Sequence, residues 1–253
     1  MNGFDTLSVI TRSPVRPRVL RCLLERGPAE TAELVEHVDA SRRTVSRTLT
    51  ALEEEGLVAV DGRTYRATTY GELFADELFA VLDGAHAHRE FAAFLDAFPT
   101  DAVDVSFESI DGTTTLRRES HPHAPVSRII ETLSGSDRVR VLAPVASPLY
   151  VRPLVARIGA GATVEAVVDE RAYDEFCTRL RTGVRLASKL TDVTLTVHED
   201  VPFGLLECDA QTVFGAYEDG VLQATFETSA ETARDAGRET FRRYRRNATV
   251  VAD

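Results

Sequence analysis

Apolar residues recur every three or four positions through the first third of the chain, which is the spacing of helices that each bury one face. The pattern predicts a helix over residues 15–28 and a second over residues 31–38, which Thr31 can cap. A third helix is expected to begin after Ser41, because a serine hydroxyl there accepts hydrogen bonds from the free amides of the first turn. The buried side of that helix would consist of Val45, Leu49 and Leu52.

Beyond the third helix the pattern changes to short strands. Gly56 suits the left-handed position that commonly ends a helix. Residues 57–68 predict two strands joined at Asp61-Gly62, a strong hairpin signal. Three helices followed by a two-stranded hairpin predict a winged helix-turn-helix domain over residues 1–70.

The side of the third helix opposite its apolar stripe carries arginine and hydroxyl side chains. An arginine fork can bind guanine O6 and N7 in a bidentate way, while hydroxyls and free helix amides suit phosphates. The alternative is a solvated helix whose arginines pair with glutamates of the same helix. Arg63 at the hairpin tip is either a minor-groove or phosphate contact or an ordinary turn residue. The candidate DNA-binding residues are Ser41, Arg42, Arg43, Thr44, Ser46, Arg47, Thr50 and Arg63.

This segment resembles the winged-helix domains of many archaeal and bacterial transcription regulators. The resemblance covers about residues 10–70 and rests on TAELVEHVDASRRTVSRTLTALEEEGLV followed by a short hairpin. It implies a DNA-binding regulator whose third helix enters the major groove of double-stranded DNA by its N-terminal part. The alternative is an interaction protein whose winged helix binds another protein.

Residues 71–99 predict a connecting helix that is apolar on several sides. Gly84 weakens its middle and is expected to divide it into two helices. One partner domain does not easily cover five phenylalanines, so we expect this segment to form a homodimer, which would favour an inverted-repeat operator. Neither the histidines of this segment nor those of residues 121–123 form a metal-ligand pattern, and no metal site is predicted. The five residues are Phe74, Phe79, Phe91, Phe94 and Phe98.

Residues 100–253 predict a layered α/β domain, so the whole chain is a multidomain α/β protein. Buried-type strands alternate with helices, four turn-linked strands follow, and Thr228 with Glu231 makes a capping box for a final helix. Residues 103–120 are alternating and turn-rich. The expected strands are 138–144, 163–169, 192–200, 203–209, 212–219 and 221–228, and the expected helices before the last are 147–162 and 170–183.

The order of elements over residues 125–247 resembles one half of the phospholipase-D-like fold. It is also similar to the middle domain of methanogenesis-regulatory (Fil-type) proteins and to the effector domains of TrmB-type archaeal regulators, with PFGLLECD as the local match. A phospholipase of that fold needs His-x-Lys-x-x-x-x-Asp. Counting back from Asp209 places Pro202 at the histidine and Gly204 at the lysine. We therefore expect no enzyme and no cofactor; the alternative is a phosphodiester or sugar-phosphate enzyme with an appended DNA-binding module.

Ligands of open α/β sheets bind at the carboxyl ends of the strands, beside helix N-termini. In this domain those positions carry Asp169 and Arg171, together with Ser147 and Arg152 of the preceding helix. We expect them to bind a small anionic or sugar-like metabolite. The alternatives are that Ser147 merely caps its helix, and that the domain serves only dimerisation.

Charge is distributed unevenly along the chain, whose formal net charge is −11. Residues 1–70 hold ten Arg and ten acidic residues, so the excess of acid lies beyond them. A single lysine among 40 acidic residues resembles cytoplasmic proteins of salt-accumulating halophilic archaea. Three widely spaced cysteines indicate reduced thiols. No run of about 20 apolar residues and no signal peptide is recognised, so we expect a cytoplasmic protein without membrane contact.

Overall fold

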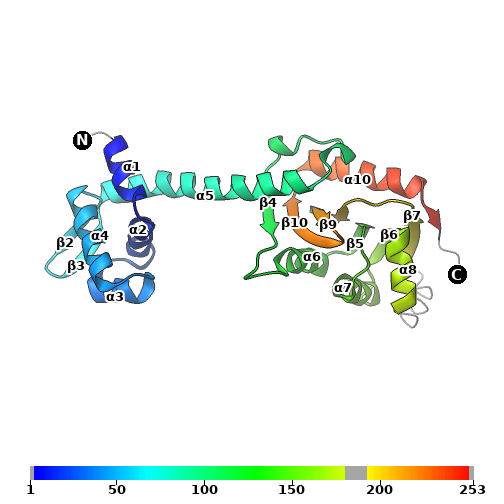
Figure 1. Cartoon of the computed structure of the whole chain (residues 1–253), viewed down its shortest axis with the longest axis horizontal. Coiled ribbons are helices and arrows are strands. Elements are labelled where there is room, and N and C mark those ends of the chain that lie inside the picture. The colour runs from blue at the N-terminus through cyan, green and yellow to red at the C-terminus, as the bar shows by residue number, and fades with distance from the viewer. Residues whose placement is uncertain (1–2, 180–192, 251–253) are drawn as a thin grey trace. The chain divides into compact units, whose positions relative to one another are not determined.

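The computed structural model describes residues 3–179 and 193–250, and most of its helices and strands are labelled in Figure 1. The chain divides into two compact units, Met1–Ala85 and His86–Asp253. We call them the N-terminal and the C-terminal unit and describe each by itself. None of the helices among the described residues is long and apolar enough to cross a membrane.

The N-terminal unit contains the predicted helices and hairpin. Its apolar core includes Val45, Leu49 and Leu52, as expected for the third helix of the predicted domain. A first helix and a third strand are additional to the prediction, and the strands form an antiparallel sheet in the order β1-β3-β2. The elements are α1 (Gly3–Thr11), α2 (Val15–Arg26), β1 (Ala29–Glu30), α3 (Thr31–His37), α4 (Arg42–Glu54), β2 (Val58–Asp61) and β3 (Thr64–Ala67).

Two helix starts differ from the predicted ones. Helix α3 begins with Thr31 itself, and the backbone N–H of Glu30 donates to the Glu33 carboxylate at 2.7 Å, so Thr31 is not the cap. Helix α10 (Glu231–Arg246) begins two residues later than the predicted capping box requires. The Thr228 hydroxyl accepts from the Ala230 N–H at 3.0 Å, before the helix begins. Both errors shift a cap by one or two positions without changing the helix.

Helix α5 (Thr69–Ala97) is one continuous helix, and the expected break at Gly84 is wrong. Its first turns pack in the N-terminal core, where a Cβ on Gly71 would lie 2.0 Å from the carbonyl oxygen of Leu57. Its last turns pack in the core of the C-terminal unit through Phe94 and Phe98. Only glycine allows this close approach of α5 to the backbone of residue 57.

The phenylalanines of α5 are covered within the chain. Phe94 and Phe98 are buried in the C-terminal core, and Phe91 packs partly buried against it. Phe74 and Phe79 pack partly buried against the N-terminal core. The expectation that these five side chains need a second copy to cover them is therefore wrong, and a dimer must be argued from other residues.

The C-terminal unit is built on an eight-stranded sheet in the order β11-β7-β6-β5-β8-β9-β10-β4. Strands β5, β6 and β7 are parallel, and the others pair antiparallel. All six predicted strands are present, whereas β4 and β11 were not expected. The strands are β4 (Thr113–Leu116), β5 (Arg138–Ala143), β6 (Thr163–Asp169), β7 (Val193–His198), β8 (Gly204–Glu207), β9 (Thr212–Glu218), β10 (Val221–Thr228) and β11 (Thr249–Val250).

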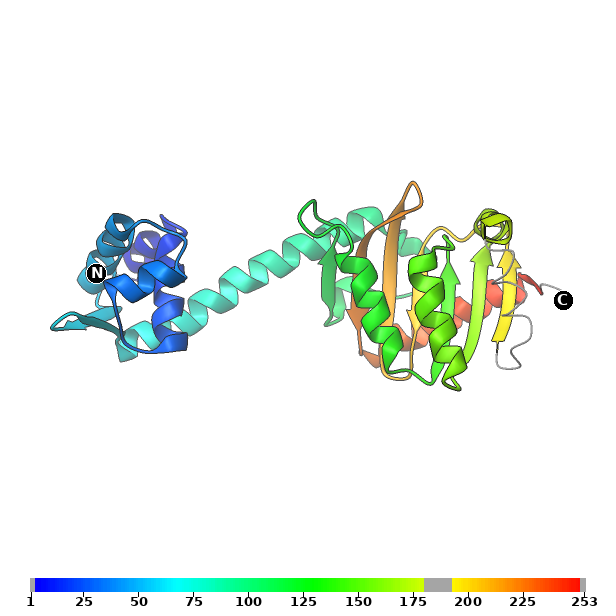
Figure 2. The same cartoon turned by 90° about the horizontal axis from the view of Figure 1, so that it is seen from below.

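Helices cover both faces of this sheet. Figure 2 shows α6 (Ala124–Ser134) and α7 (Pro148–Gly159) before the sheet and α10 behind it. Successive residues of one strand serve opposite faces: Leu205 packs in the core that contains the end of α5 and α10, and Leu206 packs in the core under α6 and α7. Helix α8 (Glu170–Arg179) follows β6, and residues 180–183 of its predicted span lie outside the described residues.

Candidate functional sites

The N-terminus of α4 is held by a side-chain cap and presents three arginines to solvent. The Ser41 hydroxyl accepts from the Thr44 N–H at 3.2 Å and lies 2.9 Å from the Thr44 hydroxyl. Arg42, Arg43 and Arg47 are exposed. None of them has an ion-pair partner within the part of the chain that the structure describes, so the glutamates of α4 do not neutralise them.

The remaining polar residues of this face follow the same helical stripe. Ser46 and Thr50 are exposed, and the Thr50 hydroxyl donates to the Ser46 carbonyl at 3.2 Å. At the opposite end of the helix, the Glu55 carboxylate accepts from the buried Thr6 hydroxyl of α1 at 3.0 Å. That carboxylate therefore faces the unit's own interior, and the cationic end of α4 stays separate from it.

The hairpin beside α4 carries two further arginines. Arg63 follows Gly62, whose φ is +62°, and lies 3.7 Å from the Glu30 carboxylate. Because 82% of the Arg63 side chain is exposed, the contact with Glu30 is weak and leaves the guanidinium accessible to a ligand. Arg66 is exposed on β3 and stands opposite Ala59. We did not predict Arg66, although the alternation of β3 would have placed it outward once Tyr65 was assigned to the core.

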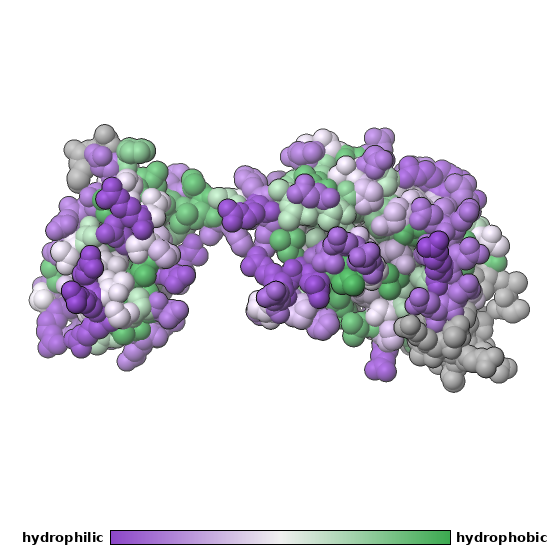
Figure 3. All heavy atoms as spheres, viewed as in Figure 1, coloured by the Kyte–Doolittle hydropathy of each residue, from purple (hydrophilic) through white to green (hydrophobic). Residues whose placement is uncertain are grey.

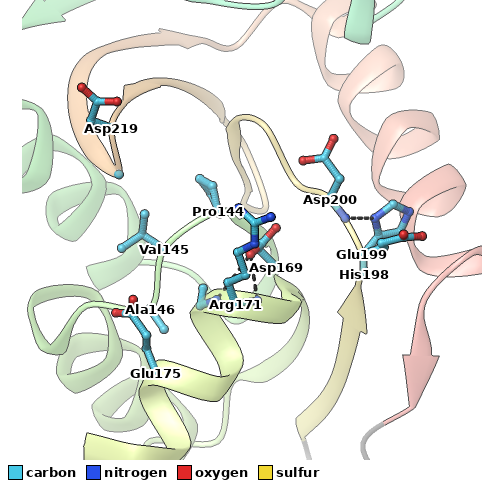
Figure 4. A pocket seen from close by; sticks show the side chains of 12 residues that line it. Pro144, Val145, Ala146, Asp169, Arg171, Glu175, His198, Glu199, Asp200 and Asp219 are labelled. Atoms are coloured by element: carbon cyan, nitrogen blue, oxygen red, sulfur yellow. Dashed lines mark hydrogen bonds between the residues drawn. The ribbon is translucent and has the colours of Figure 1, made fainter.

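In the C-terminal unit, a cavity of about 750 Å³ opens at the carboxyl ends of β5, β6 and β7 (Figure 4). Residues 144–146 follow β5, Asp169 ends β6, and His198 ends β7. The turn between β9 and β10, at Asp219-Gly220, completes the lining. The cavity lies where the topology of an open α/β sheet leads us to expect a ligand.

The structure places two of the four predicted ligand residues at the cavity and two outside its lining. Asp169 and Arg171 line the cavity, whereas Ser147 and Arg152 are not among its lining residues. The Ser147 hydroxyl accepts from the Leu149 N–H at 3.3 Å and caps α7. One Asp169 oxygen accepts from the Arg171 and Ala172 amides, and the other accepts from the Val201 amide at 3.3 Å. Asp169 therefore joins β6, α8 and the segment after β7.

The lining of the cavity is acidic. Besides Asp169 it contains four further carboxylates, and its basic side chains are Arg171 and His198. The His198 Nδ1 accepts from the Asp200 N–H at 3.1 Å. Such a lining offers many hydrogen-bond acceptors and few positive charges. The four other carboxylates are Glu175, Glu199, Asp200 and Asp219.

The positions that a phospholipase would use are occupied differently in this chain. The ring of Tyr217 lies over Gly204, where a Cβ would come within 2.9 Å of it. Burial raises the pKa of Tyr217 well above its usual value, and its hydroxyl is hydrogen-bonded to Tyr150 of α7. Asp209 accepts from the Asp137 N–H at 2.8 Å. A lysine at position 204 would collide with the tyrosine ring, so the place of the phosphate-binding residue is filled.

Both units match family models. Residues 122–247 match the model described as the middle domain of the methanogenesis regulatory protein FilR1. Residues 4–97 match the HVO_A0261 N-terminal domain. The resemblance to archaeal regulators of the Fil type, expected from residues 125–247, is thereby confirmed. Over its C-terminal unit the chain is therefore similar to a regulatory protein. No curated protein matches the chain.

Solved structures are similar to the chain at low identity. The archaeal chromatin protein TrmBL2 is 14% identical over 97% of both chains, with a TM-score of 0.44. The phospholipase D family member Nuc from Salmonella typhimurium is 12% identical over 56% of this chain and 100% of its own, also with a TM-score of 0.44. A MarR family regulator from Silicibacter pomeroyi is 25% identical over 33% of this chain and 61% of its own, with a TM-score of 0.29.

Proposed function

We propose that the chain is a transcriptional regulator of the cytoplasm whose N-terminal unit binds double-stranded DNA by α4 and the β2–β3 hairpin. The observation that carries the proposal is the exposed, unpaired cationic face of Arg42, Arg43 and Arg47 beside a capped helix N-terminus. Guanidinium groups without a carboxylate partner keep their donors for phosphates and base edges. Arg63 and Arg66 extend this face onto the hairpin.

The test is a mobility shift with the protein's own promoter DNA in molar potassium chloride, together with genome-wide mapping of the sites it occupies. Molar salt is used because counterion release contributes little there, so direct contacts must supply the affinity. We expect saturable binding that an excess of unrelated DNA does not compete away. Arg138→Ala, an exposed arginine of the C-terminal unit, is the control that removes one positive charge. Binding that is equal for every sequence would overturn the proposal of a specific regulator.

The proposed regulator is a homodimer that recognises an inverted repeat. One N-terminal unit presents one recognition helix, and two helices about 34 Å apart read the two halves of an operator. Mapped sites should therefore contain two half-sites in opposite orientation. Light scattering at micromolar concentration tests the oligomeric state separately from DNA binding.

The C-terminal cavity is proposed to bind a small metabolite. Its carboxylates accept hydrogen bonds from hydroxyl groups and repel anions, so a neutral sugar-like ligand suits the lining better than a phosphate ester. Either ligand should raise the melting temperature by mass action, in proportion to the logarithm of its concentration. Thermal shift with matched sugars and sugar phosphates decides between them.

Three alanine variants assign such a shift to the cavity. Arg171→Ala should reduce it, because Arg171 lines the cavity, whereas Arg152→Ala and Ser147→Ala should retain it. A shift that all three variants retain would place the ligand elsewhere. If no member of either series shifts the melting temperature, the sensor proposal fails and the dimerisation alternative replaces it.

A further inference from the structure

The connection between β7 and β8 passes two other strands of the sheet. β7 ends at His198 and β8 begins at Gly204, while the sheet order β7-β6-β5-β8 puts β6 and β5 between them. Strands β5, β6 and β7 are parallel and β8 is antiparallel to β5, so the connection runs along the carboxyl ends of β6 and β5, where the cavity opens. We call residues 199–203 the β7–β8 crossing.

The two sides of the β7–β8 crossing have different surroundings. Glu199 and Asp200 line the cavity (Figure 4). Val201 is 2% exposed and Phe203 is fully buried, and both belong to the apolar core that also contains Phe98, the residue after α5. Five consecutive residues therefore form a wall of the cavity and part of the core that holds the end of α5.

The wall of the cavity that α8 forms has a different neighbour. Ala172 of α8 packs with Ala166 and Val168 of β6 in a separate apolar core. Within the described ranges, 3–179 and 193–250, α5 contributes no residue to that core. A change at the cavity therefore reaches the end of α5 through the β7–β8 crossing rather than through α8.

Asp169 of β6 holds the β7–β8 crossing through one acceptor atom. One of its carboxylate oxygens accepts from the amides that begin α8, and the other accepts from the Val201 amide at 3.3 Å. This bond is slightly longer than usual for a backbone N–H donor, so it is weak. Asp169 also lines the cavity, and a ligand hydroxyl competes with Val201 for the same oxygen. The crossing therefore has two states, held by Asp169 or released.

Aromatic rings connect the β7–β8 crossing to the end of α5. The Phe203 ring lies edge-on to Phe98, with centroids 5.2 Å apart, and edge-on to Tyr244 of α10 at 5.8 Å. Figure 3 shows a hydrophilic outer surface along α10, whose apolar residues pack inward in the same core. Because protein interiors are close-packed, Phe203 cannot shift unless Phe98 and Tyr244 shift with it.

We propose that the β7–β8 crossing transmits the state of the cavity to α5, and that Phe203 is the residue that does so. A ligand that takes the Asp169 oxygen releases Val201, and the end of α5 loses a fixed neighbour when Phe203 repacks. Because α5 is one continuous helix whose first turns pack in the N-terminal core, operator binding weakens when its other end is less fixed. The inference rests on the proposed DNA-binding sensor and adds the regulation of its cavity.

A double-mutant cycle on the full chain tests this without a ligand. Asp169→Asn keeps one oxygen for the amides that begin α8 and places an amide donor opposite Val201, so it imitates the released state. We expect it to weaken operator binding about fivefold, at the lower end of usual coupling between two sites. In a Phe203→Leu background, the same change should alter operator affinity by less than about twofold.

Two matched variants separate this effect from loss of charge and of core packing. Asp209→Asn removes a carboxylate that accepts from the Asp137 N–H at 2.8 Å, at the amino end of β5, and should leave operator affinity unchanged. In a Phe241→Leu background, which alters a buried ring of the same core, Asp169→Asn should keep its full effect.

Thermal melting shows whether each variant is folded. Asp200→Gly, an exposed change within the crossing that loosens its backbone, should also weaken operator binding and replaces Asp169→Asn if that variant does not fold. Unchanged operator affinity in the folded variants overturns the inference but leaves the proposed function standing. An effect that persists with Phe203→Leu also overturns it, because the route then bypasses this ring. A wild type that binds no operator overturns the proposed function and the inference together.

Discussion

Arginines on α4 and on α10 differ in what they contact. The three arginines of α4 are exposed and have no carboxylate partner within the described residues. On α10, Arg238 lies 3.6 Å from the Glu207 carboxylate, and Arg245 contacts Glu165. Arg140 of β5 binds the same two carboxylates, Glu207 at 3.0 Å and Glu165 at 3.2 Å. Arg238 and Arg245 therefore fasten α10 to the sheet.

The reason for the difference is the burial of the acids. Glu207 is 5% exposed, and a buried carboxylate without a cation would destabilise the fold. The acids of α4 lie at its far end, and no buried carboxylate faces its arginines. The comparison shows that arginine content alone does not distinguish a helix that is fastened to the fold from one whose guanidinium groups have no carboxylate partner within the described residues.

The largest expected effect is on stability in the C-terminal unit. Glu207→Ala leaves Arg140 and Arg238 without their shared carboxylate and should lower the free energy of unfolding by about 3–5 kcal/mol. Chemical denaturation measures it. Glu54→Ala, which removes an exposed carboxylate of α4, is the control and should change stability by less than about 0.5 kcal/mol. Equal effects would remove the distinction between the two helices.

Burial also shifts the pKa of a thiol in the C-terminal unit. Burial raises the pKa of Cys208 from an ordinary value of 9.0 to about 11. The unfolded chain therefore loses this proton first, so stability is retained below pH 9 and lost as the pH rises towards 11, by about 2–3 kcal/mol. Denaturation between pH 8 and pH 11 measures this, and Cys208→Ala should flatten the decline. A decline that is as steep in the variant would contradict the assignment.

On α4 the expected effect is on binding. Arg43→Ala and Arg47→Ala should each weaken operator binding by about 1–3 kcal/mol if the side chain contacts a base. Their unfolding curves should match that of the wild type, because neither guanidinium has an internal partner. Loss of affinity for all sequences alike would indicate phosphate contacts. If neither variant binds operator more weakly, α4 is not the recognition helix.

Smaller still is the effect of the cap that starts α4. Ser41→Ala removes the acceptor of the Thr44 N–H and should destabilise the N-terminal unit by about 1 kcal/mol. Ser41→Asp should restore stability, because aspartate caps as well as serine does, yet its charge should weaken DNA binding. Thermal melting and a mobility shift on both variants separate the cap from the contact with DNA.

The smallest effect is expected on the outer side of α10. Glu239 pairs there with Arg242 and Arg246, and all three side chains are well exposed. Glu239→Ala should leave the melting temperature unchanged, because exposed ion pairs contribute little. It also frees two arginines on this helix. A gain in operator affinity would show that α10 can bind DNA as α4 is proposed to do. The contrast between the arginines of the two helices would then no longer hold.

Local features of this fold could be predicted from the sequence. The Ser41 cap, the hairpin at Gly62 and the ends of β6 each depend on residues within a few positions of one another. Hydrophobic spacing recovered β5 to β10 of the C-terminal unit in their order for the same reason. Helices α1 and α6 and strand β4 were missed, because no cap or hairpin signal was recognised at their ends.

Tertiary structure alone decided what those elements contact. The sequence by itself determined that α5 is apolar on several sides, but not that its phenylalanines are covered within the chain. It placed Pro202 and Gly204 where the phospholipase motif has its histidine and lysine, but did not show that the Tyr217 ring lies over Gly204. It placed Asp169 at a strand end, but not its bond to the Val201 amide. These contacts join residues 13 to more than 100 positions apart, and periodicity along a chain carries no information on which distant strand becomes the neighbour.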